Sequence, residues 1–294
     1  MPEKQSPDTL DHLGPLVKIP GGKGLLASAI VARMPRRIEH YVEPFMGGAA
    51  VWCELVRNRR LDDAKTVILN DVDYWLVEAM RNVKEDPETM ICKLEALKAA
   101  YEYPEKAEHV YYTVRDSWNR NIRSSVKRIF LSQGAFNGLW RENKKGHMNA
   151  AWNKRSTIVL PSREKVLALH AALKHVELTN GDFEECISPR EKHEGAVVYV
   201  DPPYLRTWND YHAGGFGLVQ HGRLLDLCRD LGRNGVTVIY SNDGTEQTRA
   251  LVAKHWPEAK VEVLYARRRI NRDGAGRGEV PELLCSINGA EVRE

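Results

Sequence analysis

The sequence predicts an α/β protein whose sheet domain is interrupted by one inserted, mostly helical domain. Three observations support this prediction. From His40 onward, short runs of β-branched residues alternate with helical patterns, as in chains that build a sheet covered by helices. A strand-like run at Tyr41–Glu43 leads through a glycine turn into a helical pattern. Between Asn82 and Leu160 the alternation stops, which indicates the insertion.

Short apolar runs bounded by turn residues predict the strands. Ala196–Val200 is a continuous apolar run, as expected for a central strand that is covered on both faces. The predicted strands are His40–Val42, Thr66–Leu69, Val176–Leu178, Val197–Val200, Val236–Tyr240, Lys260–Leu264 and Leu283–Ile287.

Stretches with helical periodicity lie between these strands and within the insertion. Pro87 stands at the first position of one stretch, where its missing N–H costs no hydrogen bond. The predicted helices are Lys23–Met34, Ala49–Arg60, Asp73–Asp86, Pro87–Ala100, Ser124–Gln133, Pro161–Leu173, Val219–Gly232 and Thr245–His255.

Composition excludes several classes of protein. Hydrophobic residues make up 43% of the 294-residue chain, and no run approaches the roughly 20 apolar residues that cross a bilayer, so we expect no membrane partner. The first twelve residues are polar, contain two prolines and lack an apolar signal core, which predicts a disordered lead. The five cysteines stand singly, without a CxxC pair, so we expect neither disulfides nor a metal site.

Positive charge is concentrated in the insertion. The whole chain carries +3, whereas Tyr111 to Leu160 has ten Lys and Arg against two acids, or +8, which leaves −5 elsewhere. Such a segment suits a surface that neutralises phosphates, and a solvated helical face is the alternative. Interleaved aromatic residues favour nucleic acid. They are Trp118, Phe136, Trp140 and Trp152.

These patterns divide the chain into three parts. Residues 1–12 form the disordered lead. Residues 13–81 and 161–294 form the sheet domain, and residues 82–160 form the inserted domain.

A glycine turn and an acid predict a ligand site at the ends of the first two strands. Gly47 and Gly48 lie between a strand and a helix, where backbone amides approach a ligand closely. The turn is not GxGxxG, which disfavours a dinucleotide. Asp71 ends the second strand and suits ribose hydroxyls, although it serves equally well as the N-cap of the next helix. Upstream, a Gly-Gly turn between Lys18 and Lys23 suits a carboxylate or a phosphate.

The loop after the fourth predicted strand reads Asp201-Pro202-Pro203-Tyr204. Ligands of open α/β sheets bind at this edge, and two prolines stiffen the loop while leaving their carbonyls free. The Asp201 carboxylate and the Pro202 carbonyl can each accept one N–H of an exocyclic amino group, which lets that nitrogen attack a methyl sulfonium. Tyr204 offers a stacking face for a flipped base. A rigid loop capped by aspartate is the alternative.

Together, these motifs resemble the Dam-type family of DNA adenine-N6 methyltransferases. The likeness spans Leu16 to Ile287, in the family's order of cofactor half, DNA-recognition domain and catalytic motif. Residues 201–204 match the catalytic Asp-Pro-Pro-Tyr. The other similar stretches are 18–23 (Lys-x-x-Gly-Gly-Lys), 43–48 (Glu-Pro-Phe-x-Gly-Gly), 136–149 (the DNA-binding hairpin), 181–182, 238–242 and 265–270.

The resemblance implies a Rossmann-like S-adenosylmethionine-dependent methyltransferase sheet with an inserted DNA-recognition domain. It implies methyl transfer from S-adenosylmethionine to N6 of a flipped-out adenine in double-stranded DNA, leaving S-adenosylhomocysteine and using no metal. The implied catalytic residues are Asp201, Pro202, Pro203 and Tyr204. The implied cofactor residues are Lys18, Gly21, Gly22, Lys23, Glu43, Pro44, Phe45, Gly47, Gly48, Asp71, Asp182 and Asp201. The implied DNA contacts are Asn137, Gly138, Leu139, Trp140, Arg141, Asn143, Lys144, Lys145 and Asn149.

Arg141 is the best candidate for a bidentate guanine contact, with a plain phosphate contact as the alternative. Asn143 and Lys145 would assist. The sequence departs from the family after the hairpin, because Asn149 is not followed by Val-Pro and Met148 replaces an aromatic residue. The target sequence therefore stays open, GATC being only the family's default.

Two alternatives remain. A cytosine-N4 methyltransferase runs the same chemistry but more often carries Ser before Pro-Pro-Tyr. A non-catalytic DNA-binding protein on the same fold should have lost Asp201 or the cofactor loop. We expect a monomer in solution, with dimerisation on DNA left open, and a cytoplasmic enzyme of a bacterium or of a phage in a bacterial host.

Overall fold

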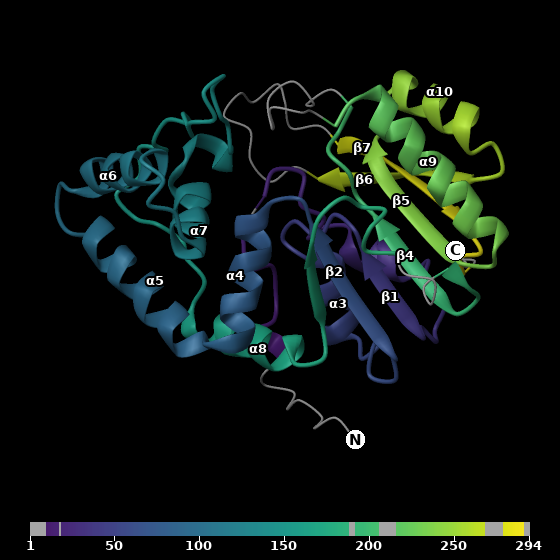
Figure 1. The fold of residues 1–294 in the computed structure, drawn as a ribbon, viewed down its shortest axis with the longest axis horizontal. Helices are drawn as coiled ribbons and strands as arrows, with labels where there is room; N and C mark the ends of the chain where they lie inside the picture. The colour runs from purple at the N-terminus through teal and green to yellow at the C-terminus, as the bar shows by residue number, and fades with distance from the viewer. Residues whose placement is uncertain (1–9, 18, 188–191, 206–215, 268–278, 291–294) are drawn as a thin grey trace.

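A computed structural model describes residues 10–17, 19–187, 192–205, 216–267 and 279–290 of the chain. One mixed sheet lies at its centre, and a group of helices stands beside the sheet (Figure 1). The sheet order is β3-β2-β1-β4-β5-β7-β6. The strands are β1 (His40–Glu43), β2 (Thr66–Asp71), β3 (Glu177–Asn180), β4 (Ala196–Val200), β5 (Thr237–Asp243), β6 (Lys260–Arg267) and β7 (Glu279–Ile287).

The topology places a reversal of strand order between β1 and β4. Strands β1 to β5 are parallel, and β7 runs antiparallel between β5 and β6. Because β1 pairs with both β2 and β4, the strand order reverses at this pair, which is where ligands of open α/β sheets commonly bind. The predicted Rossmann-like class is confirmed, and every predicted strand coincides with an observed one. Strands β5, β6 and β7 extend beyond their predicted ends.

Helices connect the strands and build the insertion. They are α2 (Ala27–Val31), α3 (Ala50–Arg57), α4 (Tyr74–Glu85), α5 (Pro87–Tyr101), α6 (Ala107–Asn119), α7 (Ser125–Gly134), α8 (Arg163–Leu173), α9 (Leu218–Arg233) and α10 (Glu246–His255). The helix predicted at Lys23–Met34 is reduced to the five residues of α2. Helix α6 was not predicted separately, although Tyr111, Val114 and Trp118 are buried at helical spacing on one of its faces.

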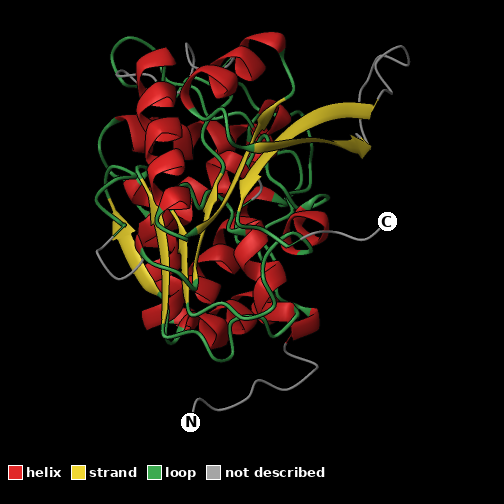
Figure 2. Ribbon diagram, turned by 90° about the vertical axis from the view of Figure 1, so that its right-hand side faces the viewer, coloured by secondary structure: helices red, strands yellow, loops and turns green. Residues whose placement is uncertain are grey.

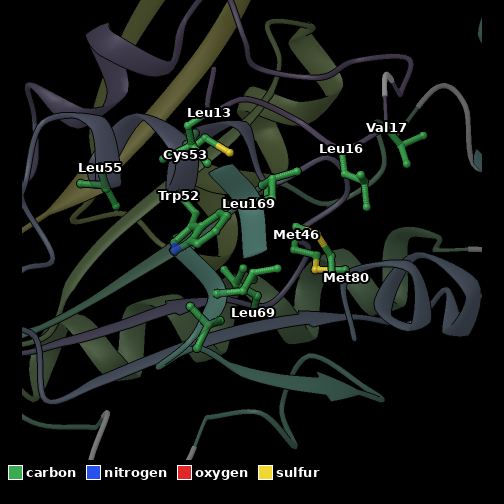
Figure 3. Packing of buried hydrophobic residues seen from close by; sticks show 14 of the residues in the cluster. Leu13, Leu16, Val17, Met46, Trp52, Cys53, Leu55, Leu69, Met80 and Leu169 are labelled. Carbon is green, nitrogen blue, oxygen red and sulfur yellow. The ribbon is translucent and has the colours of Figure 1, made fainter. Parts of the chain in front are cut away.

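Apolar residues alternate between the two faces of the sheet. On β4, Val197 and Tyr199 face one hydrophobic cluster, and Val198 and Val200 face the other. The first cluster joins the sheet to α2, α3, α4, α5, α7 and α8, and the second joins it to α9 and α10. Figure 2 shows helices on both sides of the sheet. In the first cluster, side chains that include Trp52 meet those of strand β2 and helix α8 (Figure 3).

A third hydrophobic cluster lies within the insertion. Its fully buried members all fall between Tyr101 and Ile158, and its largest side chains include Trp118 and Phe130. Helices α5, α6 and α7, which supply much of it, stand to the left of the sheet in Figure 1. Helix α7 packs against α4, the helix that follows β2. The insertion therefore contacts the sheet domain close to the end of β2.

The predicted disordered lead of residues 1–12 is wrong at its last residues. Leu10 and Asp11 are helical, and Leu10 packs against the first cluster because its apolar side chain finds a partly buried position there. Residues 1–9 lie outside the described part of the chain. Within the described ranges, no helix is both long and apolar enough to cross a membrane.

Candidate active site

The Asp201 carboxylate lies directly after β4, at the edge where the strand order reverses. Its Oδ1 accepts hydrogen bonds from Lys23 Nζ at 2.6 Å and from Ser241 Oγ at 3.2 Å. No donor among the described residues reaches Oδ2, and 18% of the side chain is exposed. The first oxygen is therefore fixed by the protein, and the second is open to a substrate.

Lys23 was predicted among the cofactor-binding residues. In the structure its ammonium contacts the carboxylates of Asp201 and Glu282. Its ammonium donates to Asp201 and to the Gly21 carbonyl at 3.1 Å, and it lies 3.2 Å from Glu282 Oε1. Only 4% of its side chain is exposed, so the charge is balanced by these neighbours instead of by water. Gly22 closes the preceding turn through its N–H to the Ile19 carbonyl at 3.0 Å. Lys18 lies outside the described residues.

Burial shifts the proton affinities of this site. It raises the pKa of Asp201, against the opposing pull of the Lys23 ammonium. It also raises the pKa of Glu282 to about 7, with the Asp201 charge acting in the same direction and Lys23 opposing both. For Lys23, burial disfavours the charged form, but the attraction of Asp201 and Glu282 outweighs it and raises the pKa. The ammonium is therefore permanent, and the two carboxylates compete for it.

The proline carbonyls of the loop are less free than predicted. Asn242 Nδ2 donates to the Pro202 carbonyl at 3.3 Å, a long bond that leaves the second lone pair of this oxygen unused. The Pro203 backbone hydrogen-bonds to the buried imidazole of His221, whose pKa burial lowers to about 4. The Tyr204 hydroxyl donates to Glu282 Oε2 at 2.7 Å. Side chains from α9, β5 and β7 thus hold the Asp-Pro-Pro-Tyr loop.

Asp71 joins the glycine turn to the end of β2. Its Oδ2 accepts the Gly47 N–H at 2.9 Å, and its Oδ1 accepts the Asp73 N–H at 2.9 Å. The N-cap of α4 is Asp73, which accepts from the N–H groups of Trp75 and Leu76, so Asp71 is not used as the cap. Burial, reinforced by the Asp73 charge, raises the pKa of Asp71 to about 6. Each Asp71 oxygen keeps a lone pair for a ligand.

Glu43 is buried behind the turn. Its Oε2 accepts the Tyr41 hydroxyl hydrogen at 2.8 Å, and burial raises its pKa to about 8. The Pro44 carbonyl accepts from Asn70 Nδ2 at 3.0 Å. Phe45 is partly exposed and stacks on Phe183, with ring centroids 5.6 Å apart. The carboxyl of Glu43 thus supports the loop from inside the protein.

Gly48 and Asp182 have local partners. At Gly48, a Cβ would lie 2.6 Å from the Val17 carbonyl, so glycine is needed for the N-terminal segment to pack on this turn. Asp182 is exposed and pairs with Arg223, whose guanidinium lies 4.5 Å from the centroid of the Phe183 ring. An incoming ligand amine would have to share Asp182 with this arginine.

The predicted DNA-binding hairpin is a compact loop with one antiparallel bridge between Glu142 and Met148. Asn143 shapes its tip, because its Oδ1 accepts the N–H groups of Lys145 and His147. Arg141 is exposed, and its Nε donates to Asn149 Oδ1 at 3.0 Å. The predicted contacts that are exposed are Asn137, Leu139, Arg141, Asn143, Lys144 and Lys145.

Trp140 does not lie on this surface. It is 7% exposed and belongs to the hydrophobic cluster of the insertion, with its centroid 5.1 Å from that of Trp118. The Arg128 guanidinium lies 3.9 Å from the Trp140 centroid and pairs with Asp73 at 2.9 Å. The structure thus places the large ring of Trp140 in the core of the insertion and away from the exposed surface of the loop.

Comparison with known proteins gives the family. Residues 20–269 match the family described as D12 class N6 adenine-specific DNA methyltransferase. The chain belongs to this family. The predicted resemblance to adenine-N6 methyltransferases is confirmed, and the match favours adenine over the cytosine-N4 alternative.

Several curated methyltransferases are similar along nearly their whole length. The type II methyltransferase M.MjaIII of Methanocaldococcus jannaschii is 30% identical over 289 residues, covering 92% of this methyltransferase and 97% of the relative. The type II methyltransferase M1.LlaDCHI of Lactococcus lactis subsp. cremoris is 27% identical over 293 residues, covering 95% and 96%. The DNA adenine methylase of Escherichia coli strain K12 is 28% identical over 281 residues, covering 92% and 93%.

Methyltransferases of this kind use S-adenosylmethionine, and the residues near the β1–β4 edge have suitable chemistry. Asp71 keeps carboxylate lone pairs for hydroxyl groups, and Phe45 exposes part of an aromatic ring beside the same turn. Within the described ranges, no three His, Cys, Asp or Glu side chains gather as a metal-binding group.

Two residues of this methyltransferase's acidic site were not predicted from the sequence. Glu282 has no motif around it, and only the register of β7 brings it to the Asp-Pro-Pro-Tyr loop. Ser241 lies within a stretch that resembles the family, but its hydrogen bond to Asp201 depends on the pairing of β4 with β5. Both depend on strand pairing, which no local pattern reports.

Proposed function

We propose that this methyltransferase modifies N6 of an adenine flipped out of double-stranded DNA, at a specific sequence that the inserted domain reads. The observation that carries the proposal is the Asp201 carboxylate, with Oδ1 held by Lys23 and Ser241 and Oδ2 open. S-adenosylmethionine would supply the electrophilic methyl group.

The roles of the loop residues follow from their contacts. Asp201 Oδ2 would accept one N–H of the amino group, and the Pro202 carbonyl would accept the other through its remaining lone pair. These two hydrogen bonds would draw the nitrogen lone pair out of conjugation with the ring. Tyr204 would stack on the flipped base, and its hydroxyl bond to Glu282 supports a fixed ring orientation. Pro203 would keep the loop stiff.

Cofactor binding is proposed for the residues around the β1–β4 edge. Asp71 would bind the ribose hydroxyls, and Phe45 would contact the adenine moiety beside Phe183. Asp182 would accept from the adenine amino group, sharing its charge with Arg223. The remaining assigned positions would shape the loops that surround the cofactor, and they are Lys18, Gly21, Gly22, Glu43, Pro44, Gly47 and Gly48.

DNA binding is proposed for residues 82–160, treated as one recognition domain, with 13–81 and 161–294 as the catalytic domain. The hydrophobic cluster between Tyr101 and Ile158 supports this division, although buried residues of α5 and α7 also belong to the first cluster, which packs on the sheet. Of the ten basic residues between Tyr111 and Leu160, those that are exposed are Arg120, Arg141, Lys144, Lys145, Lys154 and Arg155. This charge would neutralise DNA phosphates, and Arg141 would read a guanine.

The proposal is tested by incubating the protein with labelled S-adenosylmethionine and unmethylated genomic DNA, then mapping modified bases by sequencing. We expect N6-methyladenine at one recurring sequence with the wild type and none with Asp201→Ala. Asp230→Ala, an exposed change on α9, is the matched control and should retain activity. Equal product from Asp201→Ala, or modified bases without a common sequence, would contradict the proposal.

A further inference from the structure

A second buried carboxylate lies beside Asp201. Glu282 is on β7, paired in register with Asp243 of β5 and Leu264 of β6, and only 5% of it is exposed. β7 is the strand that runs antiparallel to β5. The strand pairing thus delivers an acid from near the end of the chain into a site built from the N-terminal segment and the β4 loop.

Both oxygens of Glu282 contact residues that the proposed function uses. Oε2 accepts the Tyr204 hydroxyl hydrogen at 2.7 Å, and Oε1 lies 3.2 Å from Lys23 Nζ. The same ammonium binds Asp201 at 2.6 Å and the Tyr204 oxygen at 3.3 Å. Glu282 therefore touches both the ring that would stack on the base and the cation that holds Asp201.

The charges of this cluster do not balance when every group is ionised. Two carboxylates then share one ammonium, and the cluster carries one excess negative charge in a buried place. Burial and the repulsion from the Asp201 charge together raise the pKa of Glu282 to about 7. Ionised Glu282 draws part of the ammonium's charge away from Asp201, which makes Asp201 a stronger hydrogen-bond acceptor. Protonated Glu282 leaves the ammonium to Asp201 alone.

We propose that Glu282 is a positioning residue for the methyl transfer: its carboxylate fixes the Tyr204 ring through the phenol hydroxyl and shares the Lys23 ammonium with Asp201. The proposal rests on the proposed function, because it assigns Glu282 to the same site. It predicts effects on turnover and on its pH dependence, with smaller effects on the binding of either substrate.

The first test compares Glu282→Gln with the wild type on genomic DNA. Glutamine keeps an oxygen for the Tyr204 hydroxyl but carries no charge. We expect kcat to fall roughly 10- to 100-fold, with KM for S-adenosylmethionine and for DNA changed less than about twofold. Glu262→Gln is the control, since Glu262 lies on the neighbouring strand and pairs with Arg33 and Lys260 away from this cluster. It should leave kcat unchanged.

The pH profile separates positioning from a general loss of structure. The titratable and charged groups around Glu282 are Lys23, Asp201 and Tyr204, with Tyr199 on β4 and Asp243 on β5. Because Glu282 ionises near pH 7, wild-type kcat should rise as pH passes that value. In Glu282→Gln this rise should be absent. If kcat of the variant still rises with pH, the titrating group is Asp201, and the proposal is overturned.

Tyr204→Phe tests the contact to the ring, because it keeps the ring and removes the hydroxyl. In the Tyr204→Phe background, Glu282→Gln should lower kcat by a smaller factor than in the wild type, because the contact between Glu282 and the Tyr204 hydroxyl is already lost. Additive losses would overturn the ring-fixing role. Should Glu282→Gln fail to fold, Glu282→Asp carries the test: it keeps the charge, retracts the carboxylate, and should lower kcat while keeping the pH rise.

Failure of this inference is distinct from failure of the proposed function. Wild-type protein that forms no N6-methyladenine contradicts the function itself. Wild-type protein that does form it, beside a Glu282→Gln variant of equal kcat and equal pH profile, overturns only the role of Glu282.

Discussion

Buried carboxyl groups gather around the β1–β4 edge, and each is held by different donors. Glu43 accepts from Tyr41, Asp71 from two backbone N–H groups, and Asp201 from Lys23 and Ser241. Asp201 has a compensating cation in contact, whereas Glu43 has only neutral donors. Burial therefore affects Glu43 strongly and raises its pKa to about 8.

Glu43 gives a prediction for stability against pH. Its folded pKa lies above the unfolded value of 4.5, so its stabilising effect is complete below pH 4.5 and is lost as pH rises through about 8. Glu43→Gln does not titrate. The free energy of unfolding of the variant, relative to the wild type, should therefore increase between pH 5 and pH 8 by roughly 1–3 kcal/mol.

Thermal unfolding of both proteins between pH 5 and pH 9 measures this difference. Glu88→Gln, which removes an exposed carboxylate of α5, is the control and should give a difference that does not change with pH. A Glu43→Gln difference that is equally constant would show that Glu43 ionises in the folded protein as easily as in the unfolded chain.

At the scale of elements, Arg128 forms a buried link between the insertion and the sheet domain. Arg128 of α7 is buried, binds Asp73 at the start of α4, and lies over the Trp140 ring. Asp73 in turn donates its N–H to Asp71. The proposed ribose-binding acid and the core beneath the proposed DNA-binding loop are thus connected through a short series of direct contacts.

Arg128→Met should lower the free energy of unfolding by about 1–3 kcal/mol, because it removes the charged partner of the Asp73 carboxylate, which is 13% exposed and keeps its N-cap hydrogen bonds. Arg233→Met is the control, since its pair with Glu258 is exposed and should contribute about 0–1 kcal/mol. Chemical denaturation measures both. Adding Asp73→Asn to Arg128→Met should recover part of the lost free energy of unfolding, because it removes the unpaired charge. If the second substitution instead lowers the free energy of unfolding further, the two side chains do not act as a pair.

The loop proposed to bind DNA gives a second prediction at this scale. Arg141 is exposed and oriented by Asn149, a geometry suited to reading one base. Arg141→Ala should relax discrimination at one guanine by about 1–3 kcal/mol, measured as methylation rates on a set of sites that differ at single positions. Lys144→Ala, a substitution of a neighbouring exposed residue, should lower the methylation rate by the same factor at all of these sites. A uniform loss with Arg141→Ala would instead assign Arg141 to phosphate.

At the scale of the whole molecule, the charge is polarised between the insertion and the remainder of the chain. The exposed basic residues of the insertion should make DNA binding strongly dependent on salt. About six phosphate contacts would lower the affinity roughly 10³-fold between 50 and 200 mM salt.

Changing both Lys144 and Lys145 to Gln should reduce the slope of log affinity against log salt by about 2, since each phosphate contact contributes about 0.9. Arg57→Gln on α3, where Arg57 pairs with Glu54, should leave the slope unchanged. Affinity measured by fluorescence anisotropy at several salt concentrations checks this. An unchanged slope in the double variant would place the phosphate contacts elsewhere on the protein.

The sequence by itself determined the parts of this protein that depend on neighbouring residues. The glycine turn after β1 and the Asp-Pro-Pro-Tyr loop after β4 were predicted where they occur, because strand patterns and turn residues act within a few positions of each other. The same holds for the positions of the strands and for most of the helices.

Tertiary structure decided which of these residues meet. Glu282 reaches Lys23 only because β7 runs antiparallel to β5 in one register. Trp140 is buried because α6 and α7 enclose it, although its neighbours in sequence are exposed. Burial and charge pairing depend on contacts between segments distant in the chain, so a local pattern predicts that an acid or an aromatic ring is present but not what it touches.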